Sequence, residues 1–306
     1  MVSFVVENFE HLPGIQMNFL LYLLFSLLKV IIPIFPLGFI RLIAKLIGKM
    51  FYYIIPVRKK TAISNLQLAF PGKSKSEINK TVKGCYINVI TVIAEFFYMR
   101  KLTAGELAKQ MKVKNINIFN EKLKQGKGII LISAHYGNWE LTAFGVSKLI
   151  NVPFNVIVKE QTNKRVNEGI NKIRTYSGNK MLDMRNSLRG ILTVLKNNGI
   201  AAMLGDQSAP KENVKVDFFI KGVPTYEGTA RIAIKTGAVV LFGVSTRDHD
   251  GTYSLEMHEI DTSKYKEPSE ENIKALTQDH VNLLVEYIKL RPDHWLWFHR
   301  RFKNVV

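Results

Sequence analysis

The sequence predicts an α/β protein, in which a mixed sheet is flanked by helices and preceded by an apolar helical segment. The first observation is a pair of short apolar runs, Ile129–Ile132 and Ile200–Leu204, each bordered by glycine. Runs of this length between glycines favour buried strands. The second is a set of amphipathic stretches, such as Ser269–Leu290, that can cover a sheet. The third is an almost uncharged N-terminus, which favours a membrane anchor.

The apolar N-terminal segment is barely long enough to span a bilayer. Residues 12–28 carry no charge, and after Lys29 the apolar run resumes as far as Phe35. A cleaved signal peptide is not expected, because Glu7 and Glu10 stand where a basic region would be. The run is compatible with a spanning helix and with a helix that lies in the interface.

A basic stripe marks the next stretch, residues 39–55. Arg41, Lys45 and Lys49 recur every fourth residue, so on a helix they share one face of an otherwise apolar surface. This pattern is typical of a helix in the membrane interface. Lys and Arg are absent before Lys29 and frequent afterwards, which predicts that the body of the protein faces the cytoplasm. The alternative is a buried helix pair that packs on the following domain.

The charge of the chain implies an anionic partner, since the formal net charge is +18 over 306 residues. Nucleic acid, an anionic membrane face and acidic or phosphorylated substrates all satisfy it, so charge alone does not choose. The single cysteine, Cys85, excludes an intramolecular disulfide. We expect residues 1–57 to form the membrane anchor and residues 58–306 to form one α/β domain.

After residue 57 the sequence predicts a succession of helices and strands. Helices are predicted in residues 73–99, within 115–127, and in 163–176, 190–198, 228–236 and 269–290. Strands are predicted in residues 129–132, 154–158, 200–204, 239–245 and 253–258. The last segment, His294–Arg301, mixes aromatic residues with cations. Because no recognised nucleic-acid motif accompanies it, we expect it to contact the membrane or the core.

The strand Ile129–Ile132 leads into Ser-Ala-His-Tyr-Gly-Asn-Trp-Glu, and this junction carries the candidate chemistry. Gly137 permits a tight turn, and Asn138 can cap a helix that begins at the next residue. His135 then lies on the connection and Glu140 in the first helical turn. Loops at strand ends commonly carry catalytic residues.

His135 and Glu140 suit a general base and the carboxylate that orients it. The imidazole would take a proton from an attacking hydroxyl while the carboxylate holds the other ring N–H. Their separation is not zinc-ligand spacing. There is no Gly-x-Ser-x-Gly elbow, and Cys85 lies in an apolar helical pattern, so we expect the hydroxyl to belong to a substrate. The spacing alone also occurs by chance in many chains.

A second strand end repeats this arrangement, because Ile200–Leu204 leads directly into Gly205-Asp206-Gln207. In a parallel sheet both ends could open on one crevice. Taken alone, Asp206 is equally compatible with a turn or helix-cap aspartate.

His135 and Glu140, within Ser-Ala-His-Tyr-Gly-Asn-Trp-Glu, resemble the first motif of the lysophospholipid acyltransferase superfamily, and specifically that of the bacterial lipid A secondary acyltransferases. The agreeing segments, in order, are Asn65–Pro71, His135–Glu140, Gly205–Gln207 and Trp297–Lys303. The likeness spans nearly everything after Arg58, and the segments together are far more specific than any one of them.

The resemblance implies a glycerol-3-phosphate-acyltransferase-like fold and transfer of a fatty acyl chain from an acyl thioester. The donor would be acyl carrier protein or acyl-CoA, and the acceptor a hydroxyl of a lipid A-type saccharolipid precursor. It also implies a bacterial inner membrane location with the catalytic domain on the cytoplasmic side. His135 and Glu140 would be catalytic, and no metal, bound cofactor or nucleic acid is implied.

An anionic phosphorylated lipid acceptor requires a cationic partner. In the family an arginine at the end of the helix 163–176 tends to face the site, and Arg174 matches best; Arg185 and Arg189 are rivals. A guanidinium can bind phosphate with two parallel hydrogen bonds. The residues expected to bind substrate are Asn138, Arg174, Asp206 and Gln207.

Two other functions fit the same residues. One is acylation of a lysophospholipid, glycolipid or aminolipid by the same chemistry. The other is a non-catalytic membrane-peripheral protein that holds anionic lipid or nucleic acid on its basic face. The presence of His135 and Glu140 together with Asp206 argues against the second.

Overall fold

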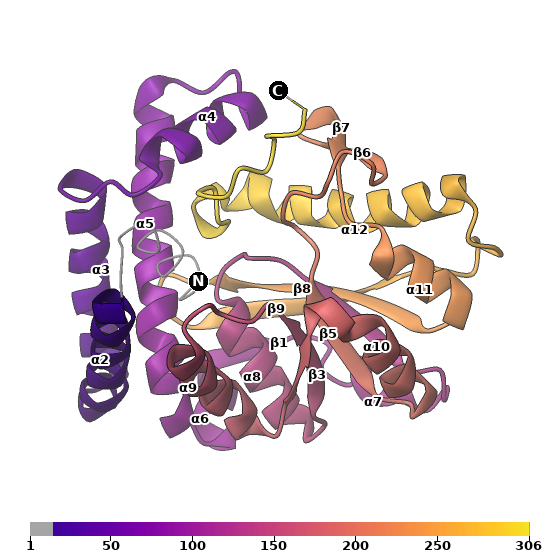
Figure 1. The fold of residues 1–306 in the computed structure, drawn as a ribbon, viewed down its shortest axis with the longest axis horizontal. Helices are drawn as coiled ribbons and strands as arrows, with labels where there is room; N and C mark the ends of the chain where they lie inside the picture. Colours follow the sequence, from indigo (N-terminus) through magenta and orange to yellow (C-terminus); the bar gives the residue numbers. More distant parts are fainter. Residues whose placement is uncertain (1–14, 306) are drawn as a thin grey trace.

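A computed structural model describes residues 15–305, and the elements lie as Figure 1 shows. Glu7, Glu10 and the start of the uncharged run lie outside the described residues. The helices are α2 (Ile15–Ile31), α3 (Leu37–Tyr53), α4 (Lys59–Ala69), α5 (Lys75–Tyr98), α6 (Ala104–Gln110), α7 (Ile118–Leu123), α8 (Trp139–Ile150), α9 (Lys164–Arg174), α10 (Ser187–Lys196), α11 (Gly228–Thr236) and α12 (Glu270–Leu290). Short 3-10 turns include η1 (Ile32–Ile34), η2 (Met99–Lys101), η3 (Thr175–Ser177), η4 (Met184–Asn186) and η5 (Pro292–His294).

The sheet at the centre has seven strands in the order β1-β9-β8-β2-β5-β3-β4. The strands are β1 (Met111–Val113), β2 (Ile129–Ser133), β3 (Phe154–Val158), β4 (Lys180–Asp183), β5 (Ile200–Leu204), β8 (Val239–Arg247) and β9 (Tyr253–Ile260), with a separate hairpin of β6 (Lys215–Phe218) and β7 (Ile220–Pro224). All neighbouring pairs in the large sheet are parallel except β8 and β9. The predicted mixed α/β fold is therefore confirmed.

Alternate residues of β2 enter two separate hydrophobic clusters, one on each face of the sheet. Ile130 and Ile132 join the cluster that contains residues of α4, α10, α11 and α12, whereas Ile129 and Leu131 join the one that contains residues of α8 and α9. This follows from the two-residue period of a strand. Figure 1 shows α12 along one face and α8 and α9 along the other. Because helices cover both faces of the sheet, the ends of its strands remain open.

The long helix α5 is a core element. Lys75–Lys101 is the one described helix long and apolar enough to cross a bilayer, but 67% of its most apolar window is buried inside the protein. Ser74 starts the helix with a capping box completed by Glu77. α5 is therefore a structural helix of the core, with α3 packed on one side and the layers of the sheet on the other.

One face of α3 packs on α5, and the rest is exposed. Ile40, Ala44, Gly48 and Tyr52 are the buried residues of α3. The approach is close, because a Cβ on Gly48 would lie 2.6 Å from the Cα of Ile87. The outward residues are mostly apolar, and Figure 1 places α2 and α3 at one end of the long axis of the molecule.

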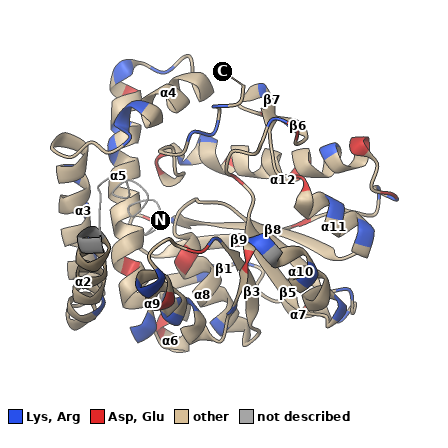
Figure 2. Ribbon diagram, viewed as in Figure 1, with Lys and Arg blue, Asp and Glu red and all other residues tan. Residues whose placement is uncertain are grey.

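Basic residues outnumber acidic ones, 43 to 25, and Figure 2 shows Lys and Arg on α9, on α11 and along the upper part of α5.

The basic stripe predicted on α3 is confirmed only in part. Lys45 and Lys49 are exposed, but Arg41 turns inward to bind the buried carboxylate of Glu95 at 2.6 Å. For Arg41, the ion pair with a buried carboxylate is more favourable than hydration of the guanidinium at the surface.

Candidate active site

Two loops meet at the carboxyl edge of the sheet. Because β2 and β5 are parallel neighbours, the residues that follow them leave the sheet side by side and bring His135 to Asp206. Gly137 reverses the chain with a φ of +59°, and a Cβ there would overlap the Ser245 carbonyl oxygen. Glycine alone meets both requirements at this turn. The expectation that both strand ends open on one site is confirmed.

Asp206 is the carboxylate that holds His135. Its Oδ1 lies 2.9 Å from Nδ1 of the imidazole, and its Oδ2 accepts the His135 backbone N–H at 2.9 Å. Trp295 donates its indole N–H to the same Oδ2 at 2.8 Å. Burial opposes ionisation, but the imidazole and these donors hold the pKa of Asp206 below its ordinary value. In the neutral ring, Nδ1 therefore carries the proton and Nε2 keeps a lone pair.

Glu140 has a different partner, so the prediction that it orients His135 directly is wrong. Arg174 donates from Nε to Oε2 of Glu140 at 2.9 Å and from Nη2 to Oε1 at 2.6 Å. Burial opposes the charge of Glu140, yet Arg174 holds the pKa of this carboxyl below its ordinary value, with a smaller contribution from His135. Because β5 is the neighbour of β2 in the sheet, the loop that follows β5 brings Asp206 to the imidazole of His135. Glu140 lies in the first turn of α8, which faces α9.

The expected phosphate-binding role of Arg174 stays a prediction. Two of its donors are already occupied by Glu140, and its side chain is 20% exposed. Of the two rivals, Arg185 pairs with Glu160 on the surface. Arg189 has no carboxylate partner among residues 15–305. Neither rival contacts His135 in the structure.

Asn138 caps α8 as predicted and connects the loop to Glu95. Its Oδ1 accepts the Leu141 N–H at 2.9 Å, and its Nδ2 donates to Oε2 of Glu95 at 2.7 Å. Glu95 is 2% exposed and is neutralised by Arg41 and Arg247. The pKa of Glu95 is lowered because these two cations outweigh its burial. With both ends of its amide occupied, Asn138 positions the loop, and its expected role in substrate binding stays a prediction.

The C-terminal segment closes over the motif loop. The Gly137 N–H donates to the His294 carbonyl at 3.0 Å, and the Leu296 N–H donates to the His135 carbonyl at 3.0 Å. The aromatic residues of this segment are buried: Trp295, Trp297, Phe298 and Phe302 are each at most 2% exposed. Of the two expected environments for this segment, the core is confirmed.

The other segments of the family resemblance meet here as well. Asn65 donates to the carbonyl oxygens of Trp297 and His299 at 2.8 and 2.7 Å. Arg301 is buried and donates to the Pro224 carbonyl and the Thr225 hydroxyl, each at 2.6 Å. Residues that are far apart in the sequence therefore support the loop that holds His135.

Two further candidate residues, Gln207 and Cys85, lie in different environments. Gln207 is exposed, and its Nε2 lies 3.4 Å from Nε2 of His135, so its expected role in substrate binding stays a prediction. Cys85 is buried and burial raises the pKa of its thiol, which keeps it protonated. Within residues 15–305 no group of three or more His, Cys, Asp or Glu side chains could hold a metal ion.

An imidazole held by a buried carboxylate at the open edge of a mixed sheet is the arrangement of an enzyme that uses a general base. Comparison with known proteins supplies the reaction: the protein is an acyltransferase. The chain belongs to the bacterial lipid A biosynthesis acyltransferase family, whose sequence profile matches residues 10–304. The family resemblance predicted from the motifs is confirmed.

Relatives with known activities are distant but match most of the chain. The lipid A biosynthesis palmitoleoyltransferase of Escherichia coli (strain K12) is 24% identical over 263 residues, which cover 84% of this chain and 83% of the relative. The phosphatidylinositol mannoside acyltransferase of Mycolicibacterium smegmatis is 25% identical over 206 residues, which cover 66% of this chain and 65% of the relative. The two relatives share acyl transfer and differ in the lipid that their names specify.

Proposed function

We propose that this acyltransferase moves a fatty acyl chain from an acyl thioester to a hydroxyl of a lipid A-type saccharolipid precursor. The donor is acyl carrier protein or acyl-CoA. The observation that carries the proposal is the His135–Asp206 pair, because it leaves Nε2 of the imidazole as a base in a chain of the lipid A acyltransferase family.

The acceptor hydroxyl oxygen attacks the thioester carbonyl carbon while its proton passes to Nε2 of His135. The resulting imidazolium is stabilised by the carboxylate of Asp206. Collapse of the tetrahedral intermediate breaks the C–S bond, and the thiolate leaves with the proton returned by the imidazolium. One ester is formed and one thiol is released, so no metal or bound cofactor is needed for the balance.

Glu140 and Arg174 act in this proposal as a positioning pair. Their two hydrogen bonds join the first turn of α8 to the end of α9, one helical turn from the loop that carries His135. Two parallel bonds between a guanidinium and a carboxylate fix orientation as well as distance. The pair therefore maintains the shape of the site on the side away from Asp206.

The exposed faces of α2 and α3 support a location at the membrane. These faces carry large apolar side chains that no described part of the chain covers: Phe19, Leu20, Leu23, Leu24, Leu27, Val30, Phe39, Leu42, Leu46 and Met50. A contiguous apolar surface of this kind on amphipathic helices is typical of interfacial binding. We propose that it lies in the bacterial inner membrane with the catalytic domain on the cytoplasmic side.

The phosphatidylinositol mannoside acyltransferase relatives favour a second candidate acceptor, a glycolipid. The chemistry would be the same, because only the source of the hydroxyl differs. Lipid mass spectrometry of cells that lack and then regain the protein distinguishes the two. A missing acyl chain on a lipid A precursor supports the first acceptor, an under-acylated glycolipid supports the second, and no change in any lipid contradicts both.

The role of His135 is tested with purified protein. His135→Ala should lower the transfer rate by about two to four orders of magnitude, because a positioned general base is lost. His249→Ala is the matched control, since His249 is exposed on the turn that follows β8. If folded His135→Ala protein, checked by circular dichroism, kept near-normal transfer, the mechanism would be wrong.

A further inference from the structure

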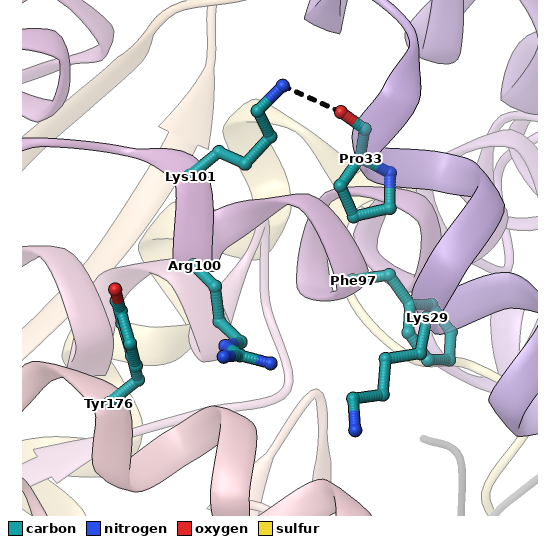
Figure 3. Close-up of a pocket in the computed structure, with 6 residues that line it drawn as sticks. All are labelled: Lys29, Pro33, Phe97, Arg100, Lys101 and Tyr176. Carbon is teal, nitrogen blue, oxygen red and sulfur yellow. Dashed lines mark hydrogen bonds between the residues drawn. The ribbon is translucent and has the colours of Figure 1, made fainter.

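A cavity lies away from the His135–Asp206 pair, where α2 meets the end of α5. Its volume is about 280 Å³, and it is lined by Lys29, Pro33, Phe97, Arg100, Lys101 and Tyr176. Figure 3 shows the lining side chains: Lys29 and Pro33 come from α2 and η1, Phe97 from the end of α5, Arg100 and Lys101 from η2, and Tyr176 from η3, with the Lys101 ammonium directed at the Pro33 carbonyl. Three of the six carry a positive charge and none carries a negative one.

Two of the three cations in this cavity, Lys29 and Arg100, have no carboxylate partner among the described residues. Within residues 15–305, neither Lys29 nor Arg100 forms an ion pair, and Lys101 donates only to the Pro33 carbonyl, at 2.7 Å. The carboxylates nearest in sequence to Arg100 and Lys101 have other partners. Glu95 is paired with Arg41 and Arg247, and Glu106 accepts from the backbone N–H and the hydroxyl of Thr103, with only a small effect of Lys101 on its pKa. Lys29 and Arg100 thus bring positive charge without a counterion to one cavity, which favours an anion there.

The shape of the cavity suits a small anion at an apolar boundary. Arg100 stacks over the Tyr176 ring with its guanidinium carbon 4.9 Å from the ring centroid, which fixes the direction of its donors. Phe97, 2% exposed, forms an apolar wall. Beside Lys29 on α2, Leu27 and Val30 are 54% and 65% exposed. An anionic group in the cavity would thus have exposed apolar surface directly next to it.

We propose that this cavity binds the phosphate of an anionic lipid whose acyl chains lie along α2. Lys29 and Arg100 bind the phosphate oxygens, and the Tyr176 hydroxyl is a further donor. The proposal rests on the proposed function only for the membrane location of α2. The shared ligand chemistry is a lipid phosphate, which either a bilayer phospholipid or the acceptor itself can supply.

The cavity is separate from the His135 site. None of its lining residues forms a hydrogen bond with His135 or Asp206. Tyr176 lies near Lys148, close to the end of α8, whereas His135 precedes the start of that helix. A phosphate in the cavity takes no part in the acyl transfer itself, and its function is to fix the position of the lipid or of the protein on the membrane.

The test uses full-length protein and a short-chain phosphatidic acid below its critical micelle concentration, with the matching phosphatidylcholine as the neutral comparison. Lys29→Gln/Arg100→Gln should weaken phosphatidic acid binding tenfold or more in calorimetric titration. Lys235→Gln/Lys274→Gln removes the same charge from exposed positions on α11 and α12 and should leave binding unchanged. Equal affinities for wild type and the cavity variant, or equal losses in both variants, would overturn the proposal.

Two further measurements identify the source of the phosphate. If the acceptor supplies it, the cavity variant should raise the KM for the acceptor in detergent and leave the KM for the donor unchanged. If a bilayer lipid supplies it, kinetics in detergent should be unchanged while sedimentation with phosphatidic acid vesicles falls. Phosphate-dependent binding by wild-type protein that transfers no acyl chain would refute the proposed function and leave this site standing.

Discussion

The carboxylate of Asp206 binds His135 at two points, the ring nitrogen Nδ1 and the backbone N–H, each at 2.9 Å. One side chain therefore fixes both the rotation of the imidazole and the position of the loop that carries it. Trp295 holds the same carboxylate from the other side, so the orientation of the base depends on the C-terminal segment as well.

Asp206→Asn should lower kcat by about two to four orders of magnitude with little change in either KM. An amide cannot accept both His135 donors and the indole N–H, so the ring loses its orientation and the imidazolium loses its counter-charge. Steady-state kinetics with each substrate varied checks this. Asp261→Asn, at an exposed position, is the control. Activity within a few-fold of wild type would show that the pair is only structural.

Glu140 and Arg174 should behave as one unit. Glu140→Gln and Arg174→Lys should each reduce the free energy of unfolding by about 1.5–3 kcal/mol, the value of a charged hydrogen bond. The double variant should cost clearly less than the sum, because both changes remove the same contact. Denaturant titration of the wild type, the two single variants and the double variant gives the four free energies of unfolding that complete the double-mutant cycle.

The same variants decide whether Arg174 binds phosphate. If it only positions α8, both single variants should lower kcat and leave the acceptor KM unchanged. A rise in the acceptor KM with Arg174→Lys alone would instead support direct phosphate binding, since lysine cannot reproduce the two parallel bonds.

Leu42→Glu/Leu46→Glu should reduce sedimentation with anionic vesicles and leave the fold intact. Both residues are more than half exposed on α3, at 54% and 52%, so the substitutions disrupt no packing. The charges would have to enter the interface, which is costly. Glu286→Gln on α12 is a surface control. Unchanged vesicle binding by the α3 variant would remove this helix from the proposed membrane surface.

Stability should fall as the pH drops from about 6.5 towards 4, in part through His280. Burial lowers the pKa of His280 to about 4, so the unfolded chain binds a proton in this window and the native state does not. The unfolding free energy then decreases by up to about 1.4 kcal/mol per pH unit for this group. His280→Gln should flatten the slope in denaturant titrations across this range, whereas exposed His249→Gln should not. Equal slopes in all three proteins would contradict the assignment.

Several strands, and the meeting of two polar strand ends, followed from local patterns. Ile129–Ile132 and Ile200–Leu204 are buried runs between glycines, and the parallel pairing of β2 with β5 brings their polar ends together. The strand Lys180–Asp183 was not predicted, because it is short and none of its residues is fully buried. The hairpin of β6 and β7 was missed for a related reason: its buried residues are interrupted by exposed polar ones.

The partner of His135 was assigned wrongly because sequence proximity is a poor guide across a sheet. Glu140 is close along the chain, but Asp206 is 71 residues away and arrives on the neighbouring strand. Glu95 could not be recognised at all, since a glutamate within an apolar helix gives no indication of partners more than 40 residues distant. Arg41 was placed on a surface stripe because helical spacing does not reveal which member of a stripe faces inward.

The ion pair between Arg41 and Glu95 changes how a detergent-free form of this enzyme should be engineered. Cutting the chain after α3 would remove one of the two cations that neutralise a buried carboxylate, and that carboxylate also holds the capping amide of Asn138 beside the loop that carries His135. Removal of α3 should therefore destabilise the surroundings of this loop. Solubility is better sought by replacing outward apolar residues of α2 and α3 one face at a time, with the inward face left as it is.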